Sequence, residues 1–329
     1  MVWKPKEKQL TLEEATALAI KELTRFWFGS KPLIAGVKSG NKVTALPLDP
    51  TFTNKSWLMF FIDPTDFSGE SVLEYACEWY RRYAPNDLNF LLFLKIPYQF
   101  LRTNEAIQQM IRKLQIPFPL ALDEEELLFS AFNAKSLPKV ILFDRNQYIF
   151  EHGGNEWLKG TELKTQQFLR SRDPGLALLQ PFQSERPLTE DGFRIDFGKN
   201  QKIPATFSGK NFSRSGKWEQ EDERIMTADP EAAIKFISPS PRISVIAQSL
   251  SKLREMSKLV IEVNGIPAFD SFASENLTMD DDGQSIAKVE DGQLYHVLAN
   301  LPEENREVTL RFPIANRVPI ALYGLRFGK

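Results

Sequence analysis

Few side chains in this sequence could do chemistry on their own. There is a single cysteine, Cys77, and there are two histidines, His152 and His296. An intramolecular disulfide is therefore impossible, and so is a zinc cluster of cysteine and histidine ligands. A catalytic histidine needs a nucleophile beside it, and the chain has no Gly-x-Ser-x-Gly turn that would present one. The sequence predicts no metal site and no cofactor.

Two acidic runs also contain potential metal ligands. Asp123-Glu124-Glu125-Glu126 stands where a helical pattern begins, and carboxylates at a helix N-terminus stabilise the helix dipole. Asp280-Asp281-Asp282-Gly283 lacks the alternating aspartates and the distal glutamate of a calcium loop. Both runs are therefore interpreted as structural, the first as a helix start and the second as a hairpin turn.

Some residues in the second half of the chain could bind a ligand. Trp218 follows Gly216-Lys217 at the start of a predicted strand, and sugar rings stack on exposed aromatic side chains, although a tryptophan in the core is the commoner arrangement. Tyr295 and His296 are neighbours in an alternating strand, so one of them points outwards and the other points into the core. The possible ligand-binding residues are Trp218, Asp282, Tyr295 and His296.

The charge of the chain excludes some partners. Its 329 residues include 41 Lys and Arg and 43 Asp and Glu, which leaves a net charge of −2. Such a chain has no positive field to attract nucleic acid or anionic lipid, and no apolar run approaches the roughly 18 residues of a membrane helix. Residues 1–14 are charged where a signal peptide is apolar, which predicts a cytoplasmic protein if Met1 is the native start.

The first half of the chain alternates between strand and helix patterns. Thr11 and Glu14 have the spacing of a capping box, which predicts a helix over residues 11–28. A hairpin over 33–48 is expected to turn at Ser39-Gly40-Asn41. The further elements are strands at 56–63, 88–96, 139–144 and 147–151 and helices near 70–84, 103–115, 124–133 and 160–171. This alternation predicts an α/β domain in which helices flank a mixed central sheet.

After residue 180 the pattern changes to short alternating strands. Asn264-Gly265, Asp282-Gly283 and Asp291-Gly292 give turn signals between several of them. Such strands without intervening helices predict an all-β sandwich or jelly roll. At roughly 100–200 residues per domain, the length allows two domains. The predicted organisation is an N-terminal helical extension at 1–29, the α/β domain at 30–180, a linker at 181–190 and the sandwich at 191–329.

Several segments resemble one known family. WLMFFID, EWYRRYAP, IPFPLALDEEELLFSAFNAKSLPKVILFD and QYIFEHGG resemble the thioredoxin-like domain of TlpA/DipZ-type proteins. NFSRSGKW, LVIEVNGIP, GQSIAKVEDGQLYHVL and EVTLRFPIANRVPIALYGLRFG resemble the carbohydrate-binding-module-like β-sandwich at the C-terminus of DipZ proteins. The resemblance implies a thioredoxin-like domain followed by such a sandwich. It also implies a periplasmic or envelope location as the alternative to the cytoplasm.

The resemblance indicates where a redox motif would stand. The two cysteines of the family fall on Asp66 and Gly69, so the motif is Asp66-Phe67-Ser68-Gly69 in this chain. Thiol–disulfide exchange needs both cysteines, one to attack and one to resolve the mixed disulfide. A peroxiredoxin register would put the peroxidatic cysteine at Ser71, whose hydroxyl is not oxidised by peroxide. The resemblance also covers Leu137-Pro138. In the family, a proline at this position faces the motif, and the peptide bond before it is usually cis.

Cys77 does not replace the missing pair. It lies in the helical run VLEYACEWYRRY beside apolar residues, and free cysteine is among the most buried residue types. Glu74 and Glu78 nearby disfavour a thiolate. The sequence therefore predicts a buried, unreactive thiol.

Two functions of different classes remain. The first is a redox-inactive recognition or scaffold protein that binds a protein or carbohydrate ligand through its groove and its β-sandwich. The alternative is an enzyme with non-thiol chemistry in the cleft near Asp66, Ser68, Ser71 and Leu137-Pro138, or a thiol-independent relative of the disulfide oxidoreductases and peroxiredoxins. The lost cysteine pair favours the first function, and the oligomeric state stays open.

Overall fold

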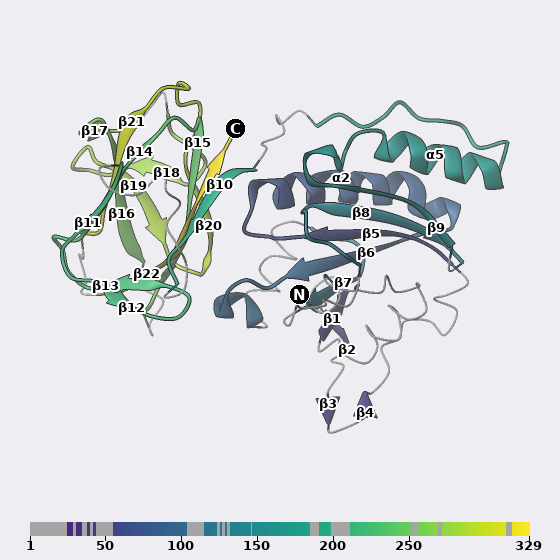
Figure 1. The fold of residues 1–329 in the computed structure, drawn as a ribbon, viewed down its shortest axis with the longest axis horizontal. Coiled ribbons are helices and arrows are strands. Elements are labelled where there is room, and N and C mark those ends of the chain that lie inside the picture. Colours follow the sequence, from purple (N-terminus) through teal and green to yellow (C-terminus); the bar gives the residue numbers. More distant parts are fainter. Residues whose placement is uncertain are drawn as a thin grey trace, which may run out of the picture. The chain divides into compact units, whose positions relative to one another are not determined.

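The chain divides into two units, which Figure 1 shows in the computed structural model. The first contains residues up to Pro64 and Ser68–Leu188, and the second contains Thr65–Phe67 and Thr189–Lys329. The structure describes residues 25–28, 31–34, 38–39, 42–43, 55–103, 115–123, 126, 129, 132–145, 147–184, 191–198, 211–251, 256–268, 272–313 and 318–329.

A seven-stranded mixed sheet organises the first unit, in the order β2-β1-β7-β6-β5-β8-β9. Strand β6 is parallel to both β5 and β7, and the other pairs are antiparallel. Strands β3 and β4 form a separate antiparallel pair, with Ser39 opposite Lys42, and the other residues of the predicted hairpin turn lie outside the described residues. The strands are β1 Arg25–Phe28, β2 Lys31–Ile34, β3 Lys38–Ser39, β4 Lys42–Val43, β5 Ser56–Ile62, β6 Leu88–Lys95, β7 Leu120–Asp123, β8 Lys139–Asp144 and β9 Gln147–Gly153.

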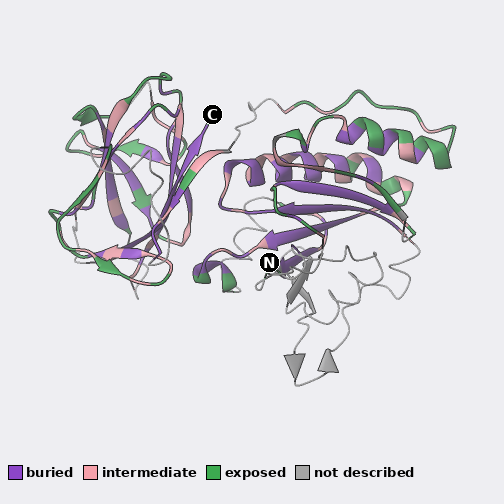
Figure 2. Cartoon of the chain, viewed as in Figure 1, coloured by how far each residue is buried: buried purple, intermediate pink, exposed green. Residues whose placement is uncertain are grey.

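The central strand β5 is buried along its whole length, as Figure 2 shows. Its side chains alternate: Met59 and Phe61 join one aromatic core cluster, while the Phe60 ring lies 6.2 Å from the ring of Trp79 on α2. Both faces of the strand are therefore covered, which explains a continuous apolar run in place of an alternating one. In the described part of this unit the helices are α2 Phe67–Tyr83 and α5 Thr161–Arg172, with short 3₁₀ turns at Ala84–Asn86, Gln99–Arg102 and Gly154–Glu156.

Two antiparallel sheets form the second unit. One has the order β12-β13-β22-β15-β20, with β10 also paired to β22, and the other has the order β11-β14-β21-β16-β19-β18, with β17 paired to β16. The first sheet contains β10 Asp191–Asp196, β12 Glu219–Gln220, β13 Ile225–Thr227, β15 Arg242–Ser249, β20 Gln293–Leu298 and β22 Ile320–Gly328. The second contains β11 Phe212–Ser215, β14 Ala233–Ser238, β16 Ser257–Val263, β17 Ile266–Pro267, β18 Leu277–Met279, β19 Ser285–Val289 and β21 Arg306–Arg311.

One apolar core joins the two sheets of the second unit. It takes Val245 and Phe327 from the first sheet and Ile261 and Leu310 from the second. Each comes from a strand in which successive side chains point to opposite faces, so one face of each sheet supplies the core. This is the arrangement of a sandwich of two sheets.

The predicted fold class is wrong. The described part of the chain is mostly β-structure and contains two α-helices, so it does not have the predicted α/β thioredoxin-like fold with flanking helices. Part of the reason lies at the sheet edge, because Arg25–Phe28, predicted as the end of a helix over 11–28, form strand β1. This short aromatic run, RFWF, pairs with β2 and β7, and such tertiary pairing overrides a weak helical pattern. The rest of that predicted helix lies outside the described residues.

Several individual elements are nevertheless confirmed. Strands were expected at 56–63, 88–96, 139–144 and 147–151, and helices near 70–84 and 160–171, where the structure has β5, β6, β8, β9, α2 and α5. The predicted helix 103–115 lies almost entirely outside the described residues, and so does most of 124–133. Among the described helices, none is both long and apolar enough to cross a membrane.

Candidate functional site

The residues at the expected motif position connect β5 to α2. Helix α2 begins at Phe67, Ser68 is buried in its first turn, and Ser71 is half-buried. A Cβ atom at Gly69 would lie 2.1 Å from the backbone oxygen of Asp63, closer than any side chain can approach. The absence of a side chain at Gly69 therefore has a steric cause in this fold. The Leu137–Pro138 bond is cis, as the family resemblance predicts.

The only cysteine is buried, as predicted. Cys77 has 7% of its surface exposed, and burial raises the pKa of its thiol to about 11, against a smaller lowering by Arg81. A thiol with this pKa is protonated at neutral pH, whereas the thiolate is the form that attacks disulfides. Cys77 therefore lacks the properties of a nucleophile.

The carboxylate of Asp66 is bound by arginine. The segment Thr65–Phe67 belongs to the second unit by its contacts, and Asp66 Oδ1 accepts a 2.7 Å hydrogen bond from Nε of Arg326. Nη1 of Arg326 donates to Asp196 Oδ1 at 2.9 Å, and Arg194 lies 3.7 Å from Asp66 Oδ2. Arg326 is 2% exposed, so its charge depends on these carboxylates for compensation. The arrangement favours a structural part for Asp66.

His296 lies in a buried polar group of the second unit. Its Nδ1 is 2.8 Å from Oγ of Ser244, and its Nε2 is 3.8 Å from a carboxylate oxygen of Glu275. Its ring stacks against Phe67 with 5.6 Å between centroids. Serine, histidine and glutamate in contact resemble a catalytic arrangement, but Ser244 is completely buried. A substrate carbonyl cannot reach a hydroxyl in that position.

Neither Tyr295 nor Asp282 is among the residues that line the pocket at Trp218 described below. Tyr295 is in the core, and its hydroxyl donates to the oxygen of Asp291 at 2.6 Å. Asp282 lies in a tight turn. The backbone amides of Asp282 and Gln284 donate hydrogen bonds to the carboxylate of Asp280 in this turn. Those amide bonds, with help from Lys258, lower the pKa of Asp280. The turn is completed by Gly283 at a φ of 72°, as expected for a hairpin connection.

Trp218 lies at a pocket of about 490 Å³ in the second unit. This volume falls within the range of small-molecule sites, roughly 300–1,000 Å³. The lining combines a half-buried aromatic ring with apolar and charged residues. The lining residues are Lys217, Trp218, Glu219, Met226, Thr227, Ala228, Asp229, Pro230, Leu250 and Pro319.

The indole ring is held in place from two sides. Its Nε1 donates a 2.7 Å hydrogen bond to the oxygen of Ser215, and its ring meets Phe312 edge-on at 5.2 Å. Gly216, just before it, has a φ of 79°, and a Cβ there would lie 2.6 Å from Cα of Ala232. The chain can therefore turn into the pocket wall only with glycine at this position.

The opposite wall of the pocket is fixed by Asp229. Its carboxylate accepts the amides of Lys217 and Glu231, at 2.8 and 3.0 Å. These bonds lower the pKa of Asp229, the one from Glu231 most strongly. Thr227 Oγ1 donates to the oxygen of Lys217 at 2.9 Å. Hydrogen bonds within the protein therefore connect Lys217 to the segment 227–229 of the pocket lining.

Two charged side chains stand beside the indole ring. Lys217 and Glu219 are both exposed, and neither forms an ion pair within the described residues. An ammonium donor, a carboxylate acceptor and a flat apolar ring in one lining can bind a molecule with one apolar face and several hydroxyl or amide groups. The sequence predicted Trp218, but Met226, Asp229, Leu250 and Pro319 come from separate stretches with no motif that could have indicated them.

No model of a known protein family matches the chain, and no curated protein matches it. Solved structures similar to it include a putative thioredoxin from Neisseria meningitidis (15% identity, 41% of this chain and 85% of that chain, TM-score 0.33). A putative thiol:disulfide interchange protein DsbE from Chlorobium tepidum shares 13% identity over 36% of this chain and 82% of that chain, with a TM-score of 0.32.

A third similar structure is a family two carbohydrate esterase from Cellvibrio japonicus, with 13% identity and a TM-score of 0.30. The match covers 41% of this chain and only 33% of the esterase chain. These scores amount to a coarse resemblance to thioredoxin-like and β-rich proteins. They carry no argument about function.

Proposed function

We propose that this protein is a recognition protein without thiol chemistry, and that its second unit holds the ligand in the pocket at Trp218. The observation that carries the proposal is the half-buried indole ring in a pocket whose lining also contains two charged side chains without an ion-pair partner in the described part of the chain. The burial of Cys77 and the arginine contacts of Asp66 support the absence of chemistry at the expected motif position.

A carbohydrate is the ligand that this lining fits best. A sugar ring has an apolar face that stacks on indole, and its hydroxyl groups can accept from Lys217 and donate to Glu219. The resemblance of the sequence to TlpA/DipZ-type proteins with a carbohydrate-binding-module-like sandwich is consistent with this ligand. An extended protein segment is the second candidate ligand.

Binding of the full chain to a glycan array at several protein concentrations tests the proposal. We expect saturable binding of a consistent sugar motif, and we expect Trp218→Ala to weaken it about tenfold or more, since stacking on an aromatic ring is worth roughly one kcal/mol beyond its buried area. Tyr148→Ala is the matched control, because Tyr148 is an exposed aromatic residue of the first unit.

Each result has a distinct meaning. A blank array from a folded chain contradicts the carbohydrate ligand, and equal binding by the Trp218→Ala variant contradicts the pocket. Reduction of insulin disulfides above a protein-free control would contradict the absence of thiol chemistry.

A further inference from the structure

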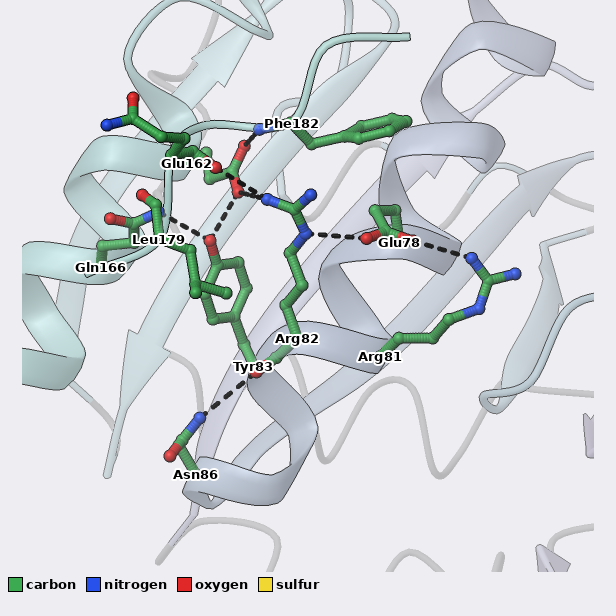
Figure 3. Close-up of polar contacts among 10 residues, drawn as sticks. Glu78, Arg81, Arg82, Tyr83, Asn86, Glu162, Gln166, Leu179 and Phe182 are labelled. Atoms are coloured by element: carbon green, nitrogen blue, oxygen red, sulfur yellow. Dashed lines mark hydrogen bonds and ion pairs between the residues drawn. The ribbon is translucent and has the colours of Figure 1, made fainter. Parts of the chain in front are cut away.

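A segment without regular secondary structure, residues 179–184, follows α5 in the chain and contacts side chains of α2 and α5. Figure 3 shows Leu179 and Phe182 of this segment beside Arg82, Glu162 and Gln166. The side chains of Pro181 and Gln183 are exposed, while those of Phe182 and Ser184 are half-buried. This alternation is that of an extended peptide with one face on a surface.

The helices bind the main chain of this segment. The side-chain amide of Gln166 donates to the oxygen of Leu179 at 3.0 Å, and Nη1 of Arg82 donates to the oxygen of Gln180 at 2.8 Å. The amide of Phe182 donates to Glu162 Oε2 at 2.7 Å. Main-chain bonds of this kind are what peptide-binding grooves use for affinity.

Two side chains of the segment are recognised as well. The ring of Phe182 meets Tyr75 edge-on with 5.0 Å between centroids, and the guanidinium of Arg82 lies 5.4 Å from the centroid of the same ring. Oγ of Ser184 donates to Glu74 at 2.6 Å. An aromatic residue followed two positions later by a hydroxyl residue therefore has a defined place.

The groups that bind the segment are positioned by bonds among themselves. Glu162 is 4% exposed, and its Oε1 accepts from the hydroxyl of Tyr83 at 2.5 Å and from Arg82 at 3.3 Å. Gln166 donates to the same tyrosine hydroxyl at 2.7 Å, and Glu78 holds Nε of Arg82 at 2.8 Å. The other oxygen of Glu162 is left for the amide of Phe182. Such preorganisation lowers the cost of binding a peptide.

We propose that α2 and α5 form a peptide-binding groove, and that residues 179–184 of the same chain are its ligand in cis. The groove takes an extended segment with an aromatic residue at the place of Phe182 and a hydroxyl residue at the place of Ser184. This site is separate from the pocket at Trp218. A tethered ligand has an effective concentration of the order of millimolar, so it keeps out weaker free peptides.

The test uses the full chain and a labelled synthetic peptide of residues 176–184, with binding followed by fluorescence anisotropy. Phe182→Ala in the chain removes the aromatic anchor of the resident segment, so this variant is expected to bind the added peptide at least tenfold more tightly than the wild-type chain does. The same peptide with Phe182→Ala is the control, and it is expected to bind at least tenfold more weakly than the wild-type peptide. Changes in the peptide cannot unfold the protein.

Two results would overturn the proposal. One is the absence of saturable binding between the Phe182→Ala chain and the wild-type peptide, and the other is equal binding of the two peptides. Hydrogen exchange adds a measurement that needs no variant. The amide of Phe182 in the wild-type chain is expected to exchange at least tenfold more slowly than in the free peptide, and equal rates would also contradict a bound segment.

Discussion

The hydroxyl of Tyr83 donates a 2.5 Å hydrogen bond to Glu162, and this bond joins α2 to α5 across a buried carboxylate. Burial and the neighbouring carboxylate raise the pKa of Tyr83, while the amide of Gln166 opposes this rise. Since the neutral phenol is the form that can donate, the raised pKa keeps the hydroxyl a donor further into the alkaline range. Glu162 in turn accepts from Phe182, so the bond between the helices also positions the groove for residues 179–184.

We expect Tyr83→Phe to destabilise the chain by about 1–3 kcal/mol, because it leaves the buried Glu162 and Gln166 with one partner fewer. Urea unfolding measures the change. Tyr148→Phe is the control, since Tyr148 is 51% exposed and its substitution should stay within about 0.5 kcal/mol. An equal effect of the two substitutions would show that the buried bond contributes nothing particular to stability.

Restoring cysteines at the expected motif position should fail for steric reasons. In most helices an exposed Gly→Ala change stabilises by up to about 1 kcal/mol. Gly69→Ala is instead expected to destabilise by about 1–3 kcal/mol, since its Cβ would lie 2.1 Å from the oxygen of Asp63. The double variant Asp66→Cys, Gly69→Cys meets the same contact and should not reduce insulin disulfides.

Urea unfolding of Gly69→Ala checks this expectation, with Leu163→Ala on helix α5 as the control. Leu163 is 50% exposed, so its change should be close to neutral. A Gly69→Ala variant as stable as the wild type would mean that the backbone near Asp63 yields easily, and would leave the absence of a side chain there unexplained.

The buried charge of Arg326 predicts a large cost for its removal. Arg326→Met removes the buried guanidinium that donates to both Asp66 and Asp196, and it leaves the half-exposed Arg194, at 3.7 and 3.3 Å, as the cation beside them. Breaking a buried pair costs about 3–5 kcal/mol, and we expect a loss towards the lower end of this range because Arg194 remains. Arg311→Met is the matched control in the same unit, because the side chain of Arg311 is 47% exposed and its pair with Glu262 should contribute about 0–1 kcal/mol. Similar losses in thermal unfolding for the two variants would contradict the structural part assigned to Arg326.

The sequence predicts local elements where one periodicity dominates. The run SWLMFFI is apolar at every position because β5 is buried on both faces, and the alternating strands of the second unit each give one face to the core. The fold class depends on pairings between distant segments, such as Arg25–Phe28 with β7, which no local pattern contains. A short aromatic run beside a helical pattern was therefore assigned to the wrong element.

The same limit applies to the candidate sites. Trp218 can be singled out because a tryptophan after Gly-Lys at a strand start is a local signal. The carboxylate of Asp229 and the side chains of Leu250 and Pro319 complete the pocket from other stretches, and only the folded chain brings them together. In the sequence, Glu162 and Arg82 are ordinary charged residues of two predicted helices, and only the packing of α2 and α5 brings them into joint contact with residues 180–182.

The raised pKa of Cys77 gives the last prediction, a loss of stability at alkaline pH. The thiol has a pKa of about 11 in the folded chain and an ordinary value of 9.0 when exposed. Between these values the unfolded chain releases a proton that the folded chain keeps, so the stabilisation is complete below pH 9 and falls as the pH rises towards 11. The Cys77→Ala variant lacks the thiol and therefore lacks this pH-dependent contribution to the free energy of unfolding. Urea unfolding of both chains at pH 7.5, 9 and 10.5 is therefore expected to show the wild type losing more stability than the variant, and parallel losses would mean that the thiol is exposed.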